Sequence, residues 1–232
     1  DLPAAERTPE AANALLLPRW EALQAERPEL ATMIEDSTDL DEASWLTDAG
    51  ALVDKWFGLE DPTRLEPAER ELYVETEIDG LTLRGYVDRL DVAPDGAMRV
   101  VDYKTGRSPG DRFEGKALFQ MKFYALVLWR LHGQIPKMLQ LVYLGDSQIV
   151  RYVPDEHDLR SLERNLQAVW AAVCRAAETG DWRPRTSKLC GWCDFKEFCP
   201  EFGGTPPPLP AHAATIALDG DGHHLGDDAG RR

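Results

Sequence analysis

The sequence lacks several features that mark common protein classes. It contains no run of about eighteen consecutive apolar residues, which excludes an ordinary membrane-spanning helix. Residues 1–7 include three charged side chains, unlike the apolar stretch of a secretory signal peptide. No segment reads G-x-x-x-x-G-K-[ST], so any ATP-driven motor that works with this chain must be a separate protein.

Cysteine is scarce and unevenly placed. The 232 residues contain four cysteines, and Cys190, Cys193 and Cys199 lie within ten residues of one another, while Cys174 stands apart. A secreted protein held together by disulfides would distribute more cysteines through a smaller chain. We therefore expect a reducing, cytoplasmic compartment and no association with a membrane.

Positive charge is also in short supply. The chain has 26 Lys and Arg against 41 Asp and Glu, for a net charge of −15. This balance argues against binding nucleic acid over the whole surface. Residues 85–151 differ, because ten basic and seven acidic residues give them a net charge of +3 and leave −18 for the rest. A local site can still attract phosphate, although the whole molecule would steer an anion only weakly.

The spacing of apolar residues predicts an α/β protein. Helical periodicity is replaced by strict alternation and then returns, and the Asp79-Gly80 and Asp95-Gly96 pairs are typical hairpin turns. Asp155 is a suitable N-cap for the last long helix. The expected helices are 9–25, 42–58, 116–131 and 155–178, and the expected strands are 72–78, 81–92, 98–104, 139–144 and 148–153.

We expect the chain to be organised in four parts. An N-terminal helical part, 1–60, precedes a core of sheet and one helix, 61–154. A long helix and the cysteine segment occupy 155–203. Residues 204–232 are rich in Pro, Gly, Asp and His, and we expect them to form a disordered acidic tail.

Charged residues in two neighbouring predicted strands carry the chemical signal. Asp102 and Lys104 are two residues apart, so they share one face of a strand, and Asp88 lies on the adjacent strand. Two carboxylates close together repel each other unless a hard cation such as Mg²⁺ binds between them. A lysine beside them could orient a water or stabilise charge on a phosphate. The alternative is an ordinary ion pair on an exposed strand.

Three motifs in order resemble those of a known family. Gly85-Tyr86-Val87-Asp88-Arg89-Leu90-Asp91, then Val100-Val101-Asp102-Tyr103-Lys104-Thr105-Gly106, then Gln120-Met121-Lys122-Phe123-Tyr124 match G-x-x-D-R-x-D, D-Y-K-T and Q-x-x-x-Y. This arrangement is similar to that of the RecB-type PD-(D/E)XK nucleases, over roughly residues 72–202. The resemblance implies a restriction-endonuclease-like α/β fold, with a central mixed β-sheet flanked by helices.

The resemblance also implies a function and the residues for it. The chain would be a Mg²⁺- or Mn²⁺-dependent deoxyribonuclease, more an exonuclease than an endonuclease, acting on DNA in repair or recombination beside a separate helicase or repair protein. Asp88, Asp102 and the main-chain carbonyl of Tyr103 would bind the metal. Lys104 would be the catalytic lysine, and Gln120 and Tyr124 would lie near it.

The accompanying residues have plainer alternatives. Gln120 and Tyr124 share a helix face, where they could fix the lysine or simply form a half-buried surface. Arg89 points away from Asp88 along the strand, so we expect it to form a structural ion pair. Arg107 and Lys116 could contact backbone phosphates, but basic residues in such places are usually only solvated.

The cysteine segment predicts a soft-metal centre. Cys190, Cys193 and Cys199 give the pattern C-x₂-C-x₅-C-P, and closely spaced thiolates bind zinc or an iron–sulfur cluster. The pattern resembles the [4Fe–4S] module at the C-terminal end of RecB-type nucleases, in which a fourth cysteine precedes the core. Cys174 is either that fourth ligand or a small buried side chain on an amphipathic helix.

Two residues of the family pattern are missing from this sequence. The family places a histidine and a cysteine before the sheet, whereas the first histidine here is His132 and the first cysteine is Cys174. We expect an upstream segment to carry both, since the sequence begins with Asp1 rather than Met. The alternative function is a degenerate accessory module that binds DNA without cleaving it and keeps a structural zinc or iron–sulfur site.

Overall fold

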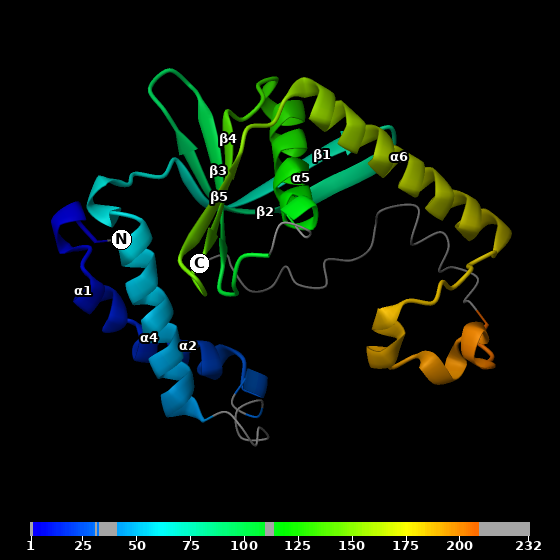
Figure 1. The fold of residues 1–232 in the computed structure, drawn as a ribbon, viewed down its shortest axis with the longest axis horizontal. Coiled ribbons are helices and arrows are strands. Elements are labelled where there is room, and N and C mark those ends of the chain that lie inside the picture. The colour runs from blue at the N-terminus through cyan, green and yellow to red at the C-terminus, as the bar shows by residue number, and fades with distance from the viewer. Residues whose placement is uncertain (1, 31, 33–40, 110–113, 209–232) are drawn as a thin grey trace. The chain divides into compact units, whose positions relative to one another are not determined.

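The computed structural model describes residues 2–30, 32, 41–109 and 114–208. The chain divides into two compact units, residues 1–76 with 83–162 and residues 77–82 with 163–232. The N-terminal helices therefore belong to the same unit as most of the sheet, and the long C-terminal helix contributes to both units. The order of the elements along the chain can be followed in Figure 1.

A five-stranded sheet in the order β1-β2-β3-β4-β5 forms the centre of the fold. The pairs β2–β3 and β4–β5 are antiparallel, whereas β3–β4 is parallel, so the sheet is mixed. Helices flank it on both faces (Figure 1). The predicted restriction-endonuclease-like α/β class is confirmed. The strands are β1 (Glu69–Ile78), β2 (Leu81–Val92), β3 (Met98–Lys104), β4 (Met138–Tyr143) and β5 (Gln148–Tyr152).

The expected hairpin turn between β1 and β2 is present. Asp79 and Gly80 both have positive φ, 50° and 76°. That conformation matches the right-handed twist of the paired strands, and Gly adopts it without steric cost. The turn fixes the register of the hairpin, and with it which face of β2 each side chain occupies.

Helix α5 (Glu114–His132) makes the crossover that a parallel strand pair requires. It packs against one face of the sheet, opposite α4 (Figure 1). Met121, Ala125 and Leu128 of the helix are fully buried, as are Val100 of β3 and Leu141 of β4 at 0% and 1% exposure. This apolar layer fixes α5 on the sheet, which brings Gln120 to Lys104 at the end of β3.

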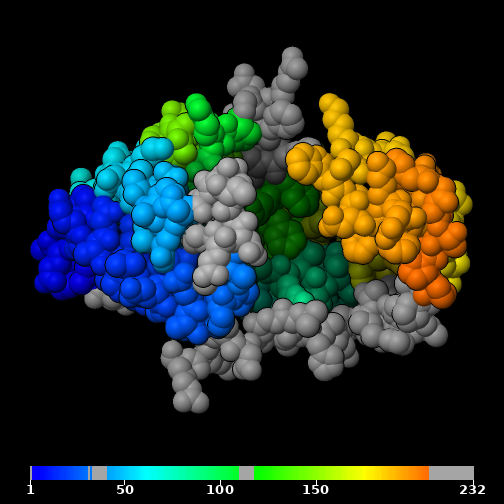
Figure 2. Space-filling model, turned by 90° about the horizontal axis from the view of Figure 1, so that it is seen from below, coloured from blue at the N-terminus to red at the C-terminus, as the bar shows by residue number. Residues whose placement is uncertain are grey.

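The N-terminal segment forms helices α1 (Pro9–Asn13), α2 (Leu16–Glu26) and α4 (Glu42–Leu59), preceded by a short 3₁₀ turn, η1 (Ala4–Glu6). The single helix expected over 9–25 was therefore wrong. Pro18 has no N–H to bond the carbonyl of Ala14, and its ring would clash with that carbonyl. Trp20 stacks on Trp45 with ring centroids 4.3 Å apart, which joins α2 to α4. Figure 2 shows these helices, blue to cyan, as one continuous surface.

Helix α6 (Glu156–Thr179) begins at the N-cap predicted for it, because Asp155 Oδ1 accepts a hydrogen bond of 2.8 Å from Asp158 N. After it, the cysteine segment contains only the 3₁₀ turns η3 (Lys188–Trp192), η4 (Lys196–Phe198) and η5 (Pro200–Phe202). No helix in the described ranges is long and apolar enough to cross a membrane. The disorder expected for the tail falls mostly outside these ranges, at 209–232.

Candidate active site

Asp88 and Asp102 lie where β2 and β3 separate. The two strands pair from Val92 opposite Met98 to Arg89 opposite Val101, and this ladder does not continue to Asp88 and Asp102. There the side chain of Asp88 takes the place of a main-chain partner for β3. Its Oδ2 accepts a hydrogen bond of 2.8 Å from the main-chain N–H of Tyr103. The carboxylate of Asp88 is therefore fixed against β3, beside the residue that follows Asp102.

Asp102 is a buried carboxylate with an unpaired oxygen. It is 1% exposed, and its Oδ2 lies 2.7 Å from Lys104 Nζ. No described residue donates a hydrogen bond to Oδ1. Burial raises the pKa of Asp102, Lys104 opposes this rise, and the negative charge of Asp88 adds to it. A buried anion with these surroundings is costly unless another cation completes them.

Lys104 belongs to a chain of hydrogen bonds that ends on α5. Its Nζ donates to Gln120 Oε1 at 3.0 Å, and Gln120 Nε2 donates to Tyr124 OH, also at 3.0 Å. The ring of Tyr124 packs so closely on Gly85 that a Cβ there would lie 2.9 Å from Tyr124 Cε1. All three sequence motifs thus meet at one place. Gln120 and Tyr124 of α5 hold the ammonium group of Lys104 beside Asp102.

This arrangement fits a hard divalent cation. Asp88 and Asp102 offer carboxylate oxygens, which Mg²⁺ and Mn²⁺ prefer, and Asp102 Oδ1 has a free coordination position among the described residues. The main chain of Tyr103 runs between Asp102 and Lys104, with its N–H held by Asp88. When bound, the metal would polarise a phosphate oxygen and lower the pKa of a coordinated water.

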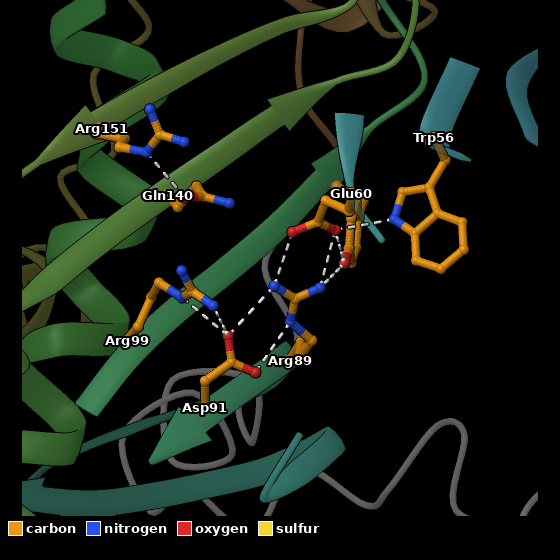
Figure 3. A network of polar contacts seen from close by, with 8 residues as sticks. Trp56, Glu60, Arg89, Asp91, Arg99, Gln140 and Arg151 are labelled. Atoms are coloured by element: carbon orange, nitrogen blue, oxygen red, sulfur yellow. Dashed lines mark hydrogen bonds and ion pairs between the residues drawn. The ribbon is translucent and has the colours of Figure 1, made fainter. Parts of the chain in front are cut away.

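A second polar network, which the sequence did not predict, lies beside this site (Figure 3). Glu60, just after α4, accepts hydrogen bonds from both terminal nitrogens of Arg89 at 2.9 Å, from Tyr103 OH at 2.7 Å and from Trp56 Nε1 at 2.9 Å. Arg89 also donates to Tyr103 OH and pairs with Asp91 at 3.1 Å. The ion pair expected for Arg89 is therefore present, with two acidic partners.

The electrostatics of this network favour the charged forms of Glu60 and Arg89 and the neutral form of Tyr103. Burial alone would raise the pKa of Glu60, but the hydrogen bonds from Arg89 and Tyr103 outweigh it and leave the pKa below its usual value. Burial raises the pKa of the Tyr103 phenol, and the hydrogen bond to Glu60 raises it further. Tyr103 therefore stays a neutral donor to Glu60 at physiological pH.

A cavity of about 690 Å³ opens beside Asp88. Its walls come mainly from α1, α4, the segment between α4 and β1, and the strands β1, β2 and β3, all within the first unit. Trp56, Tyr103 and Arg89 line it together with Asp88, and most of the remaining lining side chains are apolar. Asp102 and Lys104 do not line it, so the cavity offers space for a substrate beside Asp88 and Tyr103 rather than against the Asp102–Lys104 pair.

The loop after β3 is tied to the loop after β4. Asp146 accepts hydrogen bonds from Ser108 N at 3.0 and 3.1 Å and from Ser108 Oγ at 2.6 Å. Gly145 N donates to Gly106 O at 3.0 Å, and a Cβ on Gly145 would lie 2.6 Å from that carbonyl. Arg107 is exposed on this loop, and the side chain of Lys116 lies outside the described residues.

The cysteines do not form a closed metal centre. Cys174, Cys190, Cys193 and Cys199 are all free thiols. In the described part of the chain, the group of potential ligand atoms within 4.8 Å of one another comprises Asp155, His157 and Asp158 at the start of α6. Asp155 caps that helix and Asp158 accepts from Tyr152 and pairs with Lys122, so these acids already have structural partners.

Comparisons with known proteins give the family and the fold of this chain. The family model described as "PD-(D/E)XK nuclease superfamily" matches residues 1–200. The Gene 69 proteins of Mycobacterium phages D29 and L5 are 36% identical over 138 residues and 33% identical over 135 residues. Each alignment covers 57% of this chain, and they cover 48% and 44% of the phage proteins, so the chain spans about half the length of these curated relatives.

The fold is shared with a solved structure from Eubacterium rectale that carries the name "Putative exonuclease". The two chains superpose with a TM-score of 0.54, covering 90% of this chain and 78% of the other at 14% identity, which establishes a common fold. The family model matches most of the sequence, including the mixed sheet and the three motifs. The chain belongs to the PD-(D/E)XK nuclease superfamily.

Proposed function

We propose that this protein is a divalent-metal-dependent deoxyribonuclease of the RecB type, with Asp88, Asp102 and the carbonyl of Tyr103 as metal ligands. The observation that carries the proposal is the buried Asp102 carboxylate, whose Oδ1 has no donor among the described residues although Asp88 and Lys104 lie beside it. Burying such a group serves no purpose for stability, since an apolar residue of similar size would be cheaper to bury.

Each residue would have a distinct task. Lys104, held 2.7 Å from Asp102 and 3.0 Å from Gln120, would orient the attacking water and stabilise charge that develops on the phosphate. Gln120 and Tyr124 would keep the ammonium group in place through their own hydrogen bond. Asp88 would hold the metal and brace the main chain of Tyr103 at once.

Substitution of the lysine tests the proposal. We expect the full chain to cleave linear DNA in the presence of Mg²⁺ or Mn²⁺ but not of EDTA, and Lys104→Ala to lower the rate by about 10²–10³-fold, the loss typical of one electrostatic group. Lys137→Ala is the matched control, because this exposed lysine precedes β4 at the end of the strand opposite to Tyr143, the residue that pairs with Lys104. DNA binding without cleavage in the wild type would favour a non-catalytic accessory module instead.

We propose digestion from DNA ends, in repair or recombination, beside a separate helicase or repair protein. The name of the Eubacterium rectale structure, "Putative exonuclease", supports this proposal. A comparison of linear with covalently closed circular DNA tests this point. An exonuclease degrades only the linear form, whereas cleavage of both forms at similar rates would identify an endonuclease.

The thiols of Cys190, Cys193 and Cys199 carry a separate proposal, a structural metal centre of the [4Fe–4S] or zinc type. Its support is the C-x₂-C-x₅-C-P spacing and the free state of all three thiols. These thiols do not converge within 4.8 Å, so the segment must close on binding. No step of the nuclease chemistry depends on this centre.

A further inference from the structure

The Glu60 carboxylate connects helix α4 to both strands that carry the metal ligands. It accepts two parallel hydrogen bonds of 2.9 Å from Arg89 (Figure 3). It also accepts a hydrogen bond of 2.7 Å from Tyr103 OH. The side chains of Arg89 and Glu60 are only 5% and 8% exposed. Bidentate pairing of this kind fixes direction as well as distance.

Stability alone does not explain such a pair. Taking two charges out of water costs nearly as much as their attraction returns, and well-packed apolar residues often replace a buried ion pair without loss. A buried arginine and glutamate are therefore better explained by what they hold in place. Both residues that Glu60 contacts through strong hydrogen bonds adjoin the metal site in the sequence.

The neighbours of these two residues are the proposed ligands. Arg89 directly follows Asp88, and Tyr103 lies between Asp102 and Lys104. The ladder between β2 and β3 ends at Arg89 and Val101. Beyond it, the hydrogen bond from the main-chain N–H of Tyr103 to the Asp88 side chain joins the two strands. Glu60 accepts hydrogen bonds from one residue on each strand, Arg89 and Tyr103, where the ladder ends.

We infer that Glu60 is a positioning residue, which sets the separation of Asp88 and Asp102 by holding Arg89 and Tyr103 in one rigid unit. This inference rests on the proposed metal site. It assigns to a residue outside the three motifs the task of keeping two carboxylates at the distance that one cation can bridge. Groups that orient metal ligands in this way typically change metal affinity by about 10–100-fold when they are lost.

Mn²⁺ affinity of the full chain, measured by calorimetry or by the decrease of the free Mn²⁺ electron paramagnetic resonance signal, tests the inference without DNA. Glu60→Gln should weaken binding by about 10-fold or more. Asp91→Asn is the matched control, because Asp91 pairs with the same Arg89 but makes no hydrogen bond with Tyr103 among the described residues. It should lower the melting temperature while the Mn²⁺ affinity stays close to that of the wild type.

Two further variants make every outcome informative. Tyr103→Phe removes only the hydroxyl that donates to Glu60, so it should also weaken Mn²⁺ binding, even if Glu60→Gln does not fold. Asp102→Asn should abolish binding, and Mn²⁺ binding that survives it overturns the proposed function and this inference with it. Binding that Asp102→Asn abolishes, but that Glu60→Gln and Tyr103→Phe leave unchanged, or that Asp91→Asn weakens equally, overturns the positioning role alone.

Discussion

At the scale of single residues, the site combines groups that a stable fold would avoid. Asp102 is buried with one oxygen unpaired among the described residues, and Asp88 adds to the rise of its pKa. Proteins place such groups where function requires them and stabilise them through surrounding structure. Here the surroundings are Lys104 on one side and the main chain held by Asp88 on the other.

Gly85 allows the Tyr124 ring to approach β2, and a methyl group tests this contact. A Cβ at Gly85 would lie 2.9 Å from Tyr124 Cε1, so Gly85→Ala should lower the free energy of unfolding by about 1–3 kcal/mol, as overpacking does. Gly58→Ala is the control with the opposite sign. Gly58 lies in α4 with no atom within 4 Å of its Cβ position, so alanine there should stabilise by about 0.5–1 kcal/mol. Urea titrations compare the two, and equal effects would refute the close packing.

The residues of the site were predictable to the extent that their signals were local. Asp102 and Lys104 share a strand face and Gln120 and Tyr124 a helix face, so sequence spacing alone placed each pair side by side. Glu60 could not be found in this way. Its partner Arg89 is 29 residues away, and nothing in the sequence around Glu60 shows that the end of α4 meets β2 and β3.

At the scale of elements, β2 and β3 have the predicted bounds, because alternation of apolar residues and Gly-containing turns define strands that are half buried. The helix expected over 9–25 is interrupted instead, since Pro18 disrupts the turn that includes Ala14. The parallel pairing of β3 with β4 had no local signal. A parallel pair needs a crossover, which α5 provides, and the position of α5 is set by its packing on the sheet.

The loop after β3 is held by the carboxylate of Asp146, which accepts three hydrogen bonds from Ser108. Asp146→Asn should weaken the bonds to Ser108 and speed hydrogen exchange of the Ser108 amide, because a neutral side chain accepts more weakly than an ion. The hydrogen bonds from Ser108 lower the pKa of Asp146 below 3.8, so its stabilising effect is complete above that value. The effect is lost as the pH falls through the lowered pKa. Exchange at Ser108 that is equally slow in wild type and variant at pH 6 would contradict this account.

At the scale of the whole molecule, the proposed nuclease site lies in one part of the chain. The proposed ligands, the lysine, the network around Glu60 and the cavity all belong to the first unit, residues 1–76 and 83–162. The net charge of −15 gives no general attraction for a polyanion, so the proposed action on DNA would depend on the local excess of positive charge between residues 85 and 151. The Asp102 site would neutralise the phosphate locally through its cation and Lys104.

The second unit contains the cysteine segment, in which large apolar side chains are unusually exposed. They are Trp182, Leu189, Trp192, Phe195, Phe198 and Phe202, with Trp192 at 88%. A segment that packs so little of its apolar surface gains little stability from burial, so the metal that we propose for its thiols would add stability that packing does not supply. Cys174 lies on α6 instead, in an amphipathic helix.

This contrast yields a prediction with a control inside the same unit. After reconstitution with iron and sulfide or with zinc, the wild-type chain should bind metal, and metal at about 100 times its Kd should stabilise the fold by about 2.7 kcal/mol. Cys190→Ala should lose both the metal and the gain in stability, whereas Cys174→Ala should keep them. Elemental analysis and thermal melts measure the two effects, and visible absorption separates iron–sulfur from zinc. Loss of metal from Cys174→Ala would make Cys174 the fourth ligand, and full metal content in Cys190→Ala would remove the centre from this segment.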